Sequence, residues 1–159
     1  MGREIPMRNL ARNTLLGSVL LVPLSSFGQT DCFVKTLKVS RVEGQVFDPQ
    51  GVPVSGSSVI LLKNNKPTVT AKTDDAGRFQ LDTPAGEYWL RAANTGFAPA
   101  TVPVRVRHGF LRVLPSRGVY LILGVGMLLP CPAGTLSAKE FQSTIKKLKE
   151  TIEDHPARK

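Results

Sequence analysis

The feature that most constrains this fold is residues 73–92, where two strand patterns are separated by turn residues. In the first pattern Phe79 and Leu81 alternate with polar residues, so one strand face is apolar and the other is polar and exposed to solvent. In the second pattern the apolar side carries Tyr88, Leu90 and Ala92. The segment 83–86, Thr-Pro-Ala-Gly, is typical of a turn, because Pro fixes φ and Gly permits positive φ. The stretch therefore predicts a β-hairpin whose apolar side chains point into a core.

Further strand patterns predict that the whole domain is all-β. The chain has 12 Pro and 14 Gly in 159 residues, which favours many turns over long helices. Alternating or apolar runs predict further strands at 41–48, 59–62, 68–73, 102–107, 111–114 and 119–123. Strand 59–62 is apolar on both sides, which indicates cover on both faces. The threonine-rich strand 68–73 and the strand that contains Pro103 are expected at sheet edges.

One amphipathic helix is predicted at residues 137–155. Ser137 is placed to cap it, and Glu140 follows three residues later as the capping-box partner. Leu136 and Phe141 occupy the positions of a hydrophobic staple. An apolar stripe at spacings of four, three and four is formed by Phe141, Ile145, Leu148 and Ile152. We expect this stripe to pack on the domain's own sheet, and the alternative is a helix pair with a second copy.

Residues 1–28 have the pattern of a secretory signal peptide. The n-region carries Arg3, Arg8 and Arg12, and an apolar segment of ten residues follows at 15–24. Small residues precede Gln29, the expected first residue after cleavage. The apolar segment is shorter than the roughly 20 residues of a spanning helix, and an uncleaved anchor is the alternative. The sequence predicts an extracytoplasmic protein, periplasmic, secreted or associated with the cell envelope.

Export changes the meaning of the two cysteines, Cys32 and Cys131. An even cysteine count in an oxidising compartment favours a disulfide, which here would join the two ends of the domain. The alternative is two separate free thiols. A metal site is a weaker interpretation, because two cysteines without nearby histidines do not supply four zinc ligands.

Turn glycines and strand aromatics recur in an order that resembles a known family. The pattern Gly44-x-Val46-x-Asp48-x-x-Gly51-x-Pro53-Val54-x-Gly56-x-x-Val59-x-Leu61 is similar to the opening of a carboxypeptidase regulatory-like domain. The second half of such a domain is resembled by the pattern Thr73-x-x-x-Gly77-x-Phe79-x-Leu81, followed by Pro84-x-Gly86-x-Tyr88-x-Leu90-x-Ala92 and Gly96-Phe97. The resemblance covers residues 41–107 and implies a seven-stranded Greek-key β-sandwich of the transthyretin-like or starch-binding-like kind. It also implies a non-catalytic accessory or adhesive module of an exported bacterial protein.

The complete prediction divides the chain into six parts. They are a signal peptide (1–28), an N-terminal extension (29–40), a β-sandwich (41–126), a cysteine-containing linker (127–136), the helix (137–155) and a tail (156–159). The apolar run 119–129 is about half the length that spans a bilayer, so it is interpreted as a buried strand. No spanning segment is expected in the mature chain.

The chain carries an excess of positive charge. The formal net charge is +9, and residues 29–159 keep 18 basic and 11 acidic groups, or +7. Such a charge suits nucleic acid, anionic lipid or acidic polymer, and it is equally found on soluble cationic proteins without such ligands. Nucleic acid is not expected as a partner.

Groups for catalysis or metal binding are scarce in the sequence. His108 lies in a predicted loop and His155 in the tail, and neither is accompanied by a nucleophile motif. Asp74 and Asp75 beside Gly77 are read as a turn rather than a calcium site, because two carboxylates fall short of a full oxygen shell. The sequence also has no phosphate-binding glycine motif. Neither a cofactor nor a metal is expected.

The candidate ligand contacts are Trp89, Arg91, Arg105 and Arg107. Trp89 has the parity of Glu87 and Arg91, so it should face outward, where it can stack on a sugar ring or on a partner's apolar side chain. The alternative is that the helix or a second sheet covers it. The arginines are read either as a solvated edge that prevents strand pairing or as a site for an acidic polymer or lipid headgroups.

Three functions remain from the sequence. The first is an exported module that binds a partner protein or an envelope glycan. The second is a purely structural accessory domain of the envelope. The third is a hydrolase, which the lack of an acid, base and nucleophile set makes the weakest. The sequence does not determine the oligomeric state.

Overall fold

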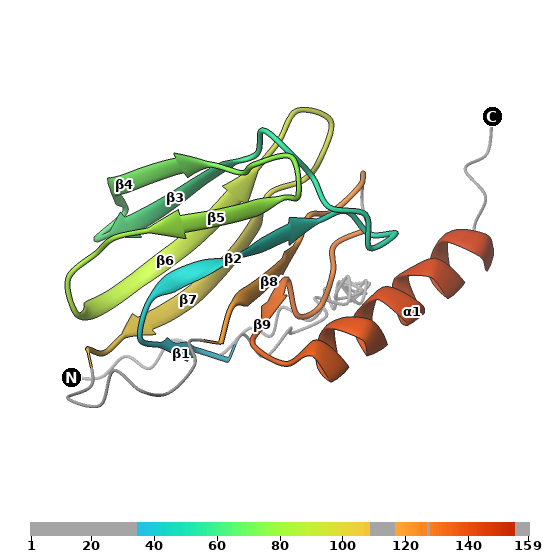
Figure 1. Ribbon diagram of the computed structural model, residues 1–159. Helices are drawn as coiled ribbons and strands as arrows, with labels where there is room; N and C mark the ends of the chain where they lie inside the picture. Colours follow the sequence, from blue (N-terminus) through green and yellow to red (C-terminus); the bar gives the residue numbers. More distant parts are fainter. Residues whose placement is uncertain (1–34, 109–116, 127, 155–159) are drawn as a thin grey trace, which may run out of the picture. The chain divides into compact units, whose positions relative to one another are not determined.

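The described residues of the computed structural model, 35–108, 117–126 and 128–154, contain nine strands and one helix (Figure 1). They all belong to one unit of the chain, residues 31–159. In chain order the elements are β1 (Leu37–Val39), β2 (Val42–Phe47), β3 (Ser58–Lys63), β4 (Lys66–Lys72), β5 (Arg78–Leu81), β6 (Gly86–Ala93), β7 (Ala100–Val106), β8 (Val119–Ile122), β9 (Gly134–Thr135) and α1 (Ala138–Asp154). The predicted signal peptide, Cys32, the predicted strand 111–114, His155 and the tail lie outside the described residues.

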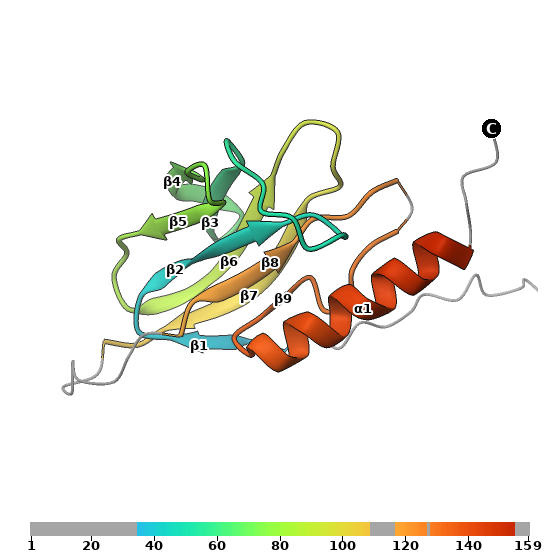
Figure 2. The ribbon, with the colours of Figure 1, turned by 45° about the vertical axis from the view of Figure 1, so that its right-hand side comes forward.

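The strands form two sheets that pack face to face (Figures 1 and 2). The five-stranded sheet has the order β1-β7-β6-β3-β4, and the four-stranded sheet has the order β5-β2-β8-β9. The seven strands β2 to β8 correspond to the predicted sandwich. The predicted number of seven is nevertheless too low, because β1 and β9 extend one edge of each sheet. These two strands have three and two residues, too few for alternation to be recognised.

The predicted hairpin at 73–92 is wrong, although the predicted burial is right. β5 pairs with β2 in one sheet, whereas β6 pairs with β3 and β7 in the other, so the chain crosses between sheets at residues 82–85. The four predicted core side chains, Phe79, Leu81, Tyr88 and Leu90, are buried, and so is Ala92 on the same side of β6. Both strands turn their apolar side to the same core from opposite sheets. Alternation reports which side of a strand is buried, and it does not report the partner strand.

The prediction that Pro103 marks an edge strand is also wrong. β7 lies between β6 and β1, and β1 pairs with it in parallel from Leu37 opposite Val104. The N–H of Arg107 donates to the carbonyl of Val39 on β1 (2.9 Å), and alternation puts the nitrogen of Pro103 on that same side. Pro103 comes before Val104, the first residue of β7 that pairs with β1. Every carbonyl of β1 can therefore find a donor although Pro103 has no N–H. The other predicted edge strand, β4, does lie at an edge.

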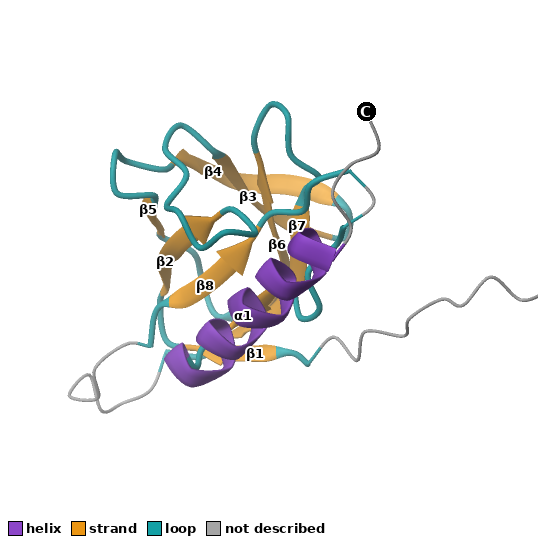
Figure 3. Ribbon diagram, turned by 90° about the vertical axis from the view of Figure 1, so that its right-hand side faces the viewer, coloured by secondary structure: helices purple, strands orange, loops and turns teal. Residues whose placement is uncertain are grey.

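A main core fills the space between the sheets, and a second apolar cluster lies under the helix. The main core takes the inward side of every strand from β1 to β8. The second cluster joins Phe47 of β2 and Ile122 of β8 to three of the four predicted stripe residues of α1, Phe141, Ile145 and Leu148. The fourth, Ile152, is only half-buried and does not belong to the cluster. The ring of Phe141 lies 4.6 Å from that of Phe47 and 5.1 Å from that of Tyr120, centroid to centroid. The helix thus docks on the chain's own four-stranded sheet, as predicted (Figure 3).

Only one of the two hydrogen bonds of the predicted capping box forms at the start of α1. Ser137 is the cap, because its Oγ accepts the N–H of Glu140 at 3.3 Å. The Glu140 carboxylate instead accepts a hydrogen bond from the hydroxyl of Thr135. That hydroxyl accepts the N–H of Ser137 at 3.1 Å, the group that the box assigns to Glu140. Thr135 is held in place by β9, a strand that the sequence did not reveal. The staple residue Leu136 packs on the main core, and Phe141 belongs to the second cluster.

Two Asp-x-x-Gly turns share one geometry. Oδ1 of Asp74 accepts the N–H groups of Ala76 (2.9 Å) and Arg78 (2.7 Å), and Gly77 has a φ of 72°. Oδ1 of Asp48 likewise accepts the N–H groups two and four residues later, and Gly51 has a φ of 80°. The Asp74 carboxylate therefore stabilises its own turn, as the turn interpretation predicts.

Candidate functional site

The outer face of the five-stranded sheet carries all four candidate ligand contacts. Because β6 alternates strictly, Tyr88, Leu90 and Ala92 enter the core while Glu87, Trp89 and Arg91 point the other way. Arg105 and Arg107 have the corresponding outward parity on β7 and directly after it. The helix packs on the opposite sheet, so it does not cover this face. Trp89 keeps 45% of its surface exposed, and the alternative in which the helix covers it is wrong.

Trp89 occupies the middle of an apolar strip. Its direct cross-strand partners are Leu62 on β3 and Pro103 on β7. Both are half-buried, as is Ile60 two residues before Leu62. The sequence predicted that strand 59–62 is covered on both faces, and this is wrong for the outer one. Ile60 and Leu62 are partly covered by side chains of neighbouring strands in the same sheet, among them Arg91 and Trp89. They are not covered by another layer of the described residues.

A shallow hollow of about 260 Å³ opens beside the indole. Its apolar lining includes Trp89, Leu62 and Pro103, and its polar lining includes Thr36 and the turn residues Asn64 and Asn65. These two residues have φ values of 51° and 61°, the backbone of a tight two-residue hairpin turn between β3 and β4. The turn comprises only these two residues, because β3 ends at Lys63 and β4 already begins at Lys66. The result is an aromatic surface bordered by amide and hydroxyl groups.

A row of charges lies next to the hollow. Glu87 faces Arg105 across β6 and β7, and the two side chains form an ion pair. Arg105 in turn faces Lys38 across β7 and β1. The Nε of Arg105 is buried and has no hydrogen-bond partner within the described part of the chain. The guanidinium is thus held against Glu87 at the wall of the hollow rather than free in solvent.

Arg91 and Arg107 are the two more exposed arginines of the set. Arg91 lies one row from Trp89, with Ile60 and Thr101 as its cross-strand partners. Arg107 continues the outward row of β7 beyond Arg105, and its side chain is exposed. The structure therefore places Trp89, Arg91 and Arg105 in adjacent rows and Arg107 at the end of the face.

Comparison with known proteins agrees with this architecture. Residues 41–114 match the family model of the carboxypeptidase regulatory-like domain. The match includes β2 to β7, both Asp-x-x-Gly turns and the whole of the Trp89 strand. The chain contains a carboxypeptidase regulatory-like domain.

A solved structure similar to this one is 5-hydroxyisourate hydrolase from Klebsiella pneumoniae. The alignment has 21% sequence identity and a TM-score of 0.42, and it covers 55% of this chain and 92% of the hydrolase. No curated protein matches the chain.

Several residues of this regulatory-like domain that line the hollow were not predicted from the sequence. The sequence predicts Leu62 on a covered face and Pro103 at a sheet edge, and it gives Asn64 and Asn65 no role at a site. Thr36, another lining residue, belongs to the predicted N-terminal extension (29–40). For Glu87 the sequence does contain a signal: it is two residues before Trp89 in the same strand, so its side chain is expected on the same face. The other lining residues could be placed beside Trp89 only once the strands that pair with β6 were known.

The remaining candidate groups lie elsewhere in the chain. His108 is exposed, and its Nε2 lies 3.2 Å from the carbonyl oxygen of Thr83. The described residues contain no group of three or more His, Cys, Asp or Glu side chains suited to a metal ion. None of the described helices is long and apolar enough to span a bilayer. Cys131 is not a free thiol, while its predicted partner Cys32 lies outside the described residues, so the pairing stays a prediction.

Proposed function

We propose that this protein is an exported, non-catalytic regulatory-like module that binds a partner protein or an envelope glycan through the outer face around Trp89. The observation that carries the proposal is the exposed indole in the middle of an apolar strip, beside a hollow with amide and hydroxyl groups. Single exposed apolar residues are common, but a Trp flanked by Leu62 and Pro103 is a contiguous apolar surface. Such a surface offers a flat ring for stacking and polar groups for orientation.

A purely structural role is the second candidate. It is favoured by the second apolar cluster, which fixes the helix to the sandwich without involving the Trp89 face. That role explains the buried side of the domain, but it gives no reason for the exposed apolar strip. A hydrolase is the weakest candidate. The exposed ring of His108 is hydrogen-bonded to a backbone carbonyl in a loop and not to a nucleophile.

Replacing Trp89 with alanine should abolish ligand binding and leave the fold intact. Stacking on an aromatic ring is worth about 0.5–1.5 kcal/mol beyond the area that it buries, and the remaining contacts on this face are shallow. The measurement is a glycan-array screen of the wild type, followed by calorimetric titration of each hit. Trp89→Phe is the matched control, because it keeps a ring at the same position and should retain part of the affinity.

The structural role makes the opposite prediction for this screen. If no glycan and no envelope protein binds the wild type, or if Trp89→Ala binds as well as the wild type, the Trp89 face is not the site. Because Trp89 is largely outside the core, the variant should unfold within a few degrees of the wild type, and circular dichroism can verify this.

The predicted Cys32–Cys131 disulfide is tested by the thiol state of the exported protein. Material from the periplasm should lack free thiols and should have a mass lower by two hydrogens than the reduced chain, because Cys32 and Cys131 are joined there. Closing a loop of this length contributes up to about 4.7 kcal/mol in the chain-entropy model. Non-reducing mass spectrometry with thiol labelling makes the measurement, and the Cys131→Ser variant serves as the unbridged reference. Labelling of both thiols in the wild type would reject the bond.

A further inference from the structure

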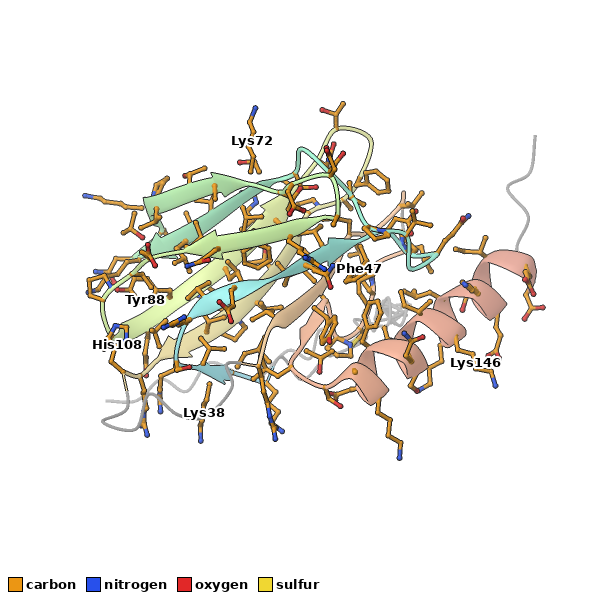
Figure 4. The ribbon with its side chains drawn as sticks, viewed as in Figure 1. Lys38, Phe47, Lys72, Tyr88, His108 and Lys146 are labelled. Atoms are coloured by element: carbon orange, nitrogen blue, oxygen red, sulfur yellow. The ribbon has the colours of Figure 1, made fainter. Side chains whose placement is uncertain are left out.

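Positive charge is concentrated on the outer face of the five-stranded sheet. The outward rows of its strands carry the cations Lys38, Lys72, Arg91, Arg105 and Arg107. Glu87 is the one acid on these described rows, and it is paired with Arg105. The helix on the opposite side has four lysines and four acidic residues, so it is neutral overall. Figure 4 shows Lys72 and Lys38 at the two opposite margins of the sheet, with Lys146 on the helix.

Protection of sheet edges does not account for this charge. Lysines at edges prevent pairing with other chains, and this suffices for Lys38 on β1 and Lys72 on β4. Arg91 and Arg105, however, lie on β6 and β7, which are internal strands. Folding does not account for it either, since Lys38 directly opposite Arg105 is a like-charge pair, which destabilises a sheet. The arrangement is explained by a ligand with negative charge.

The cations surround the indole instead of forming a separate patch. Arg91 lies in the row on one side of Trp89, and the row of Lys38 and Arg105 lies on the other. Four strand spacings separate β1 from β4, which amounts to about 19 Å across the face. A ligand that stacks on Trp89 and reaches these cations must be extended and must carry several anionic groups. The amide and hydroxyl groups of Asn64, Asn65 and Thr36 around the hollow suit a polyhydroxylated ring.

We infer that the ligand of this face is an anionic polysaccharide, a chain of sugar rings that bear carboxylate groups. The inference rests on the proposed function and makes it more specific. One ring stacks on Trp89, and acidic groups on neighbouring rings contact Arg91, Arg107 and Lys38. A lipid surface fits less well, because the other large apolar side chains that are strongly exposed among the described residues, Val52, Val125 and Leu129, belong to loops and not to this face.

The test compares polygalacturonate with dextran, an uncharged polysaccharide, on the purified protein. Trp89 is the only tryptophan of the chain, so its fluorescence reports binding at the site itself. Polygalacturonate should change the emission and dextran should not, and added salt should weaken the binding because exposed charges are screened. The double variant Arg91→Ala/Arg107→Ala should bind about tenfold more weakly, since an exposed ion pair is worth up to about 1 kcal/mol.

The matched control is Lys147→Ala/Lys149→Ala on the helix, which lowers the net charge equally at two exposed positions. We expect it to change the affinity by less than about twofold, because neither lysine is on the face. Equal losses in the two double variants would mean non-specific attraction, and the inference would be wrong. It would also be wrong if a single-stranded oligonucleotide of equal charge bound more tightly than polygalacturonate.

Two results separate this inference from the proposed function. If dextran or another neutral ligand binds in a Trp89-dependent manner and the arginine variants bind it normally, the binding function holds and the anionic ligand is rejected. If no ligand binds in a Trp89-dependent manner, both are rejected.

Discussion

Replacing Gly44 with alanine should destabilise the protein by about 3 kcal/mol or more, or prevent folding altogether. Gly44 lies on β2 between β5 and β8, with Val119 as its partner on β8. A Cβ at this position would lie 2.0 Å from the carbonyl oxygen of Val119 and 2.8 Å from its carbonyl carbon. Non-bonded carbon atoms prefer separations of about 3.5–4.0 Å. Because the obstacle is backbone, only a displacement of β8 can relieve the overlap.

Chemical unfolding of Gly44→Ala and of Gly118→Ala provides the measurement. Gly118 directly precedes β8, and a Cβ there would have its closest contact at 3.6 Å, on the Cα of Gly44. This control should therefore lose less than about 1 kcal/mol. If Gly44→Ala proves insoluble while Gly118→Ala folds, the expected difference is still observed. A Gly44→Ala protein with the stability of the wild type would show that β2 and β8 do not approach so closely.

Replacing Phe141 with alanine should release the helix from the sandwich. Its side chain is 5% exposed and lies against the rings of Phe47 and Tyr120, and truncation of such a side chain costs about 3–5 kcal/mol. A single helix of 17 residues is marginal in water, so without docking it should unfold. The main core lies on the other side of the four-stranded sheet and should persist. We therefore expect unfolding in two steps, the helix first.

Hydrogen exchange of the α1 amides distinguishes this outcome from global unfolding. In Phe141→Ala these amides should exchange much faster, while those of β3 and β6 remain protected. Gln142→Ala, at the exposed neighbouring position, should leave both sets unchanged. Equal protection of α1 in Phe141→Ala and in the wild type would show that this ring does not hold the helix. A wild-type dimer that becomes a stable monomer when the chain ends at Leu136 would assign the helix to association instead.

The candidate site could be predicted only in part. Parity alone placed Trp89 and Arg91 on the solvent side of one strand, because successive side chains of a strand must point to opposite faces. It could not show that Leu62 and Pro103 flank the indole or that Lys38 faces Arg105. The members of these pairs lie up to 67 positions apart in the chain, from Lys38 to Arg105, and their register is set by strand pairing. Whether the arginines lie at an edge depended on β1, a strand of three residues.

The sequence by itself determined the properties that depend on neighbours within a few residues. These are the buried and exposed sides of β5 and β6, the Asp-x-x-Gly turns and the bounds of the helix, which was predicted at 137–155 and spans Ala138–Asp154. Only the tertiary structure decided which strands pair, so the expected hairpin became a crossing between two sheets. It likewise gave the capping role of Glu140 partly to Thr135, because β9 brings that hydroxyl to the helix start. Local rules specify the conformation of a segment, whereas the identity of its partner depends on burying the apolar sides of all segments at once.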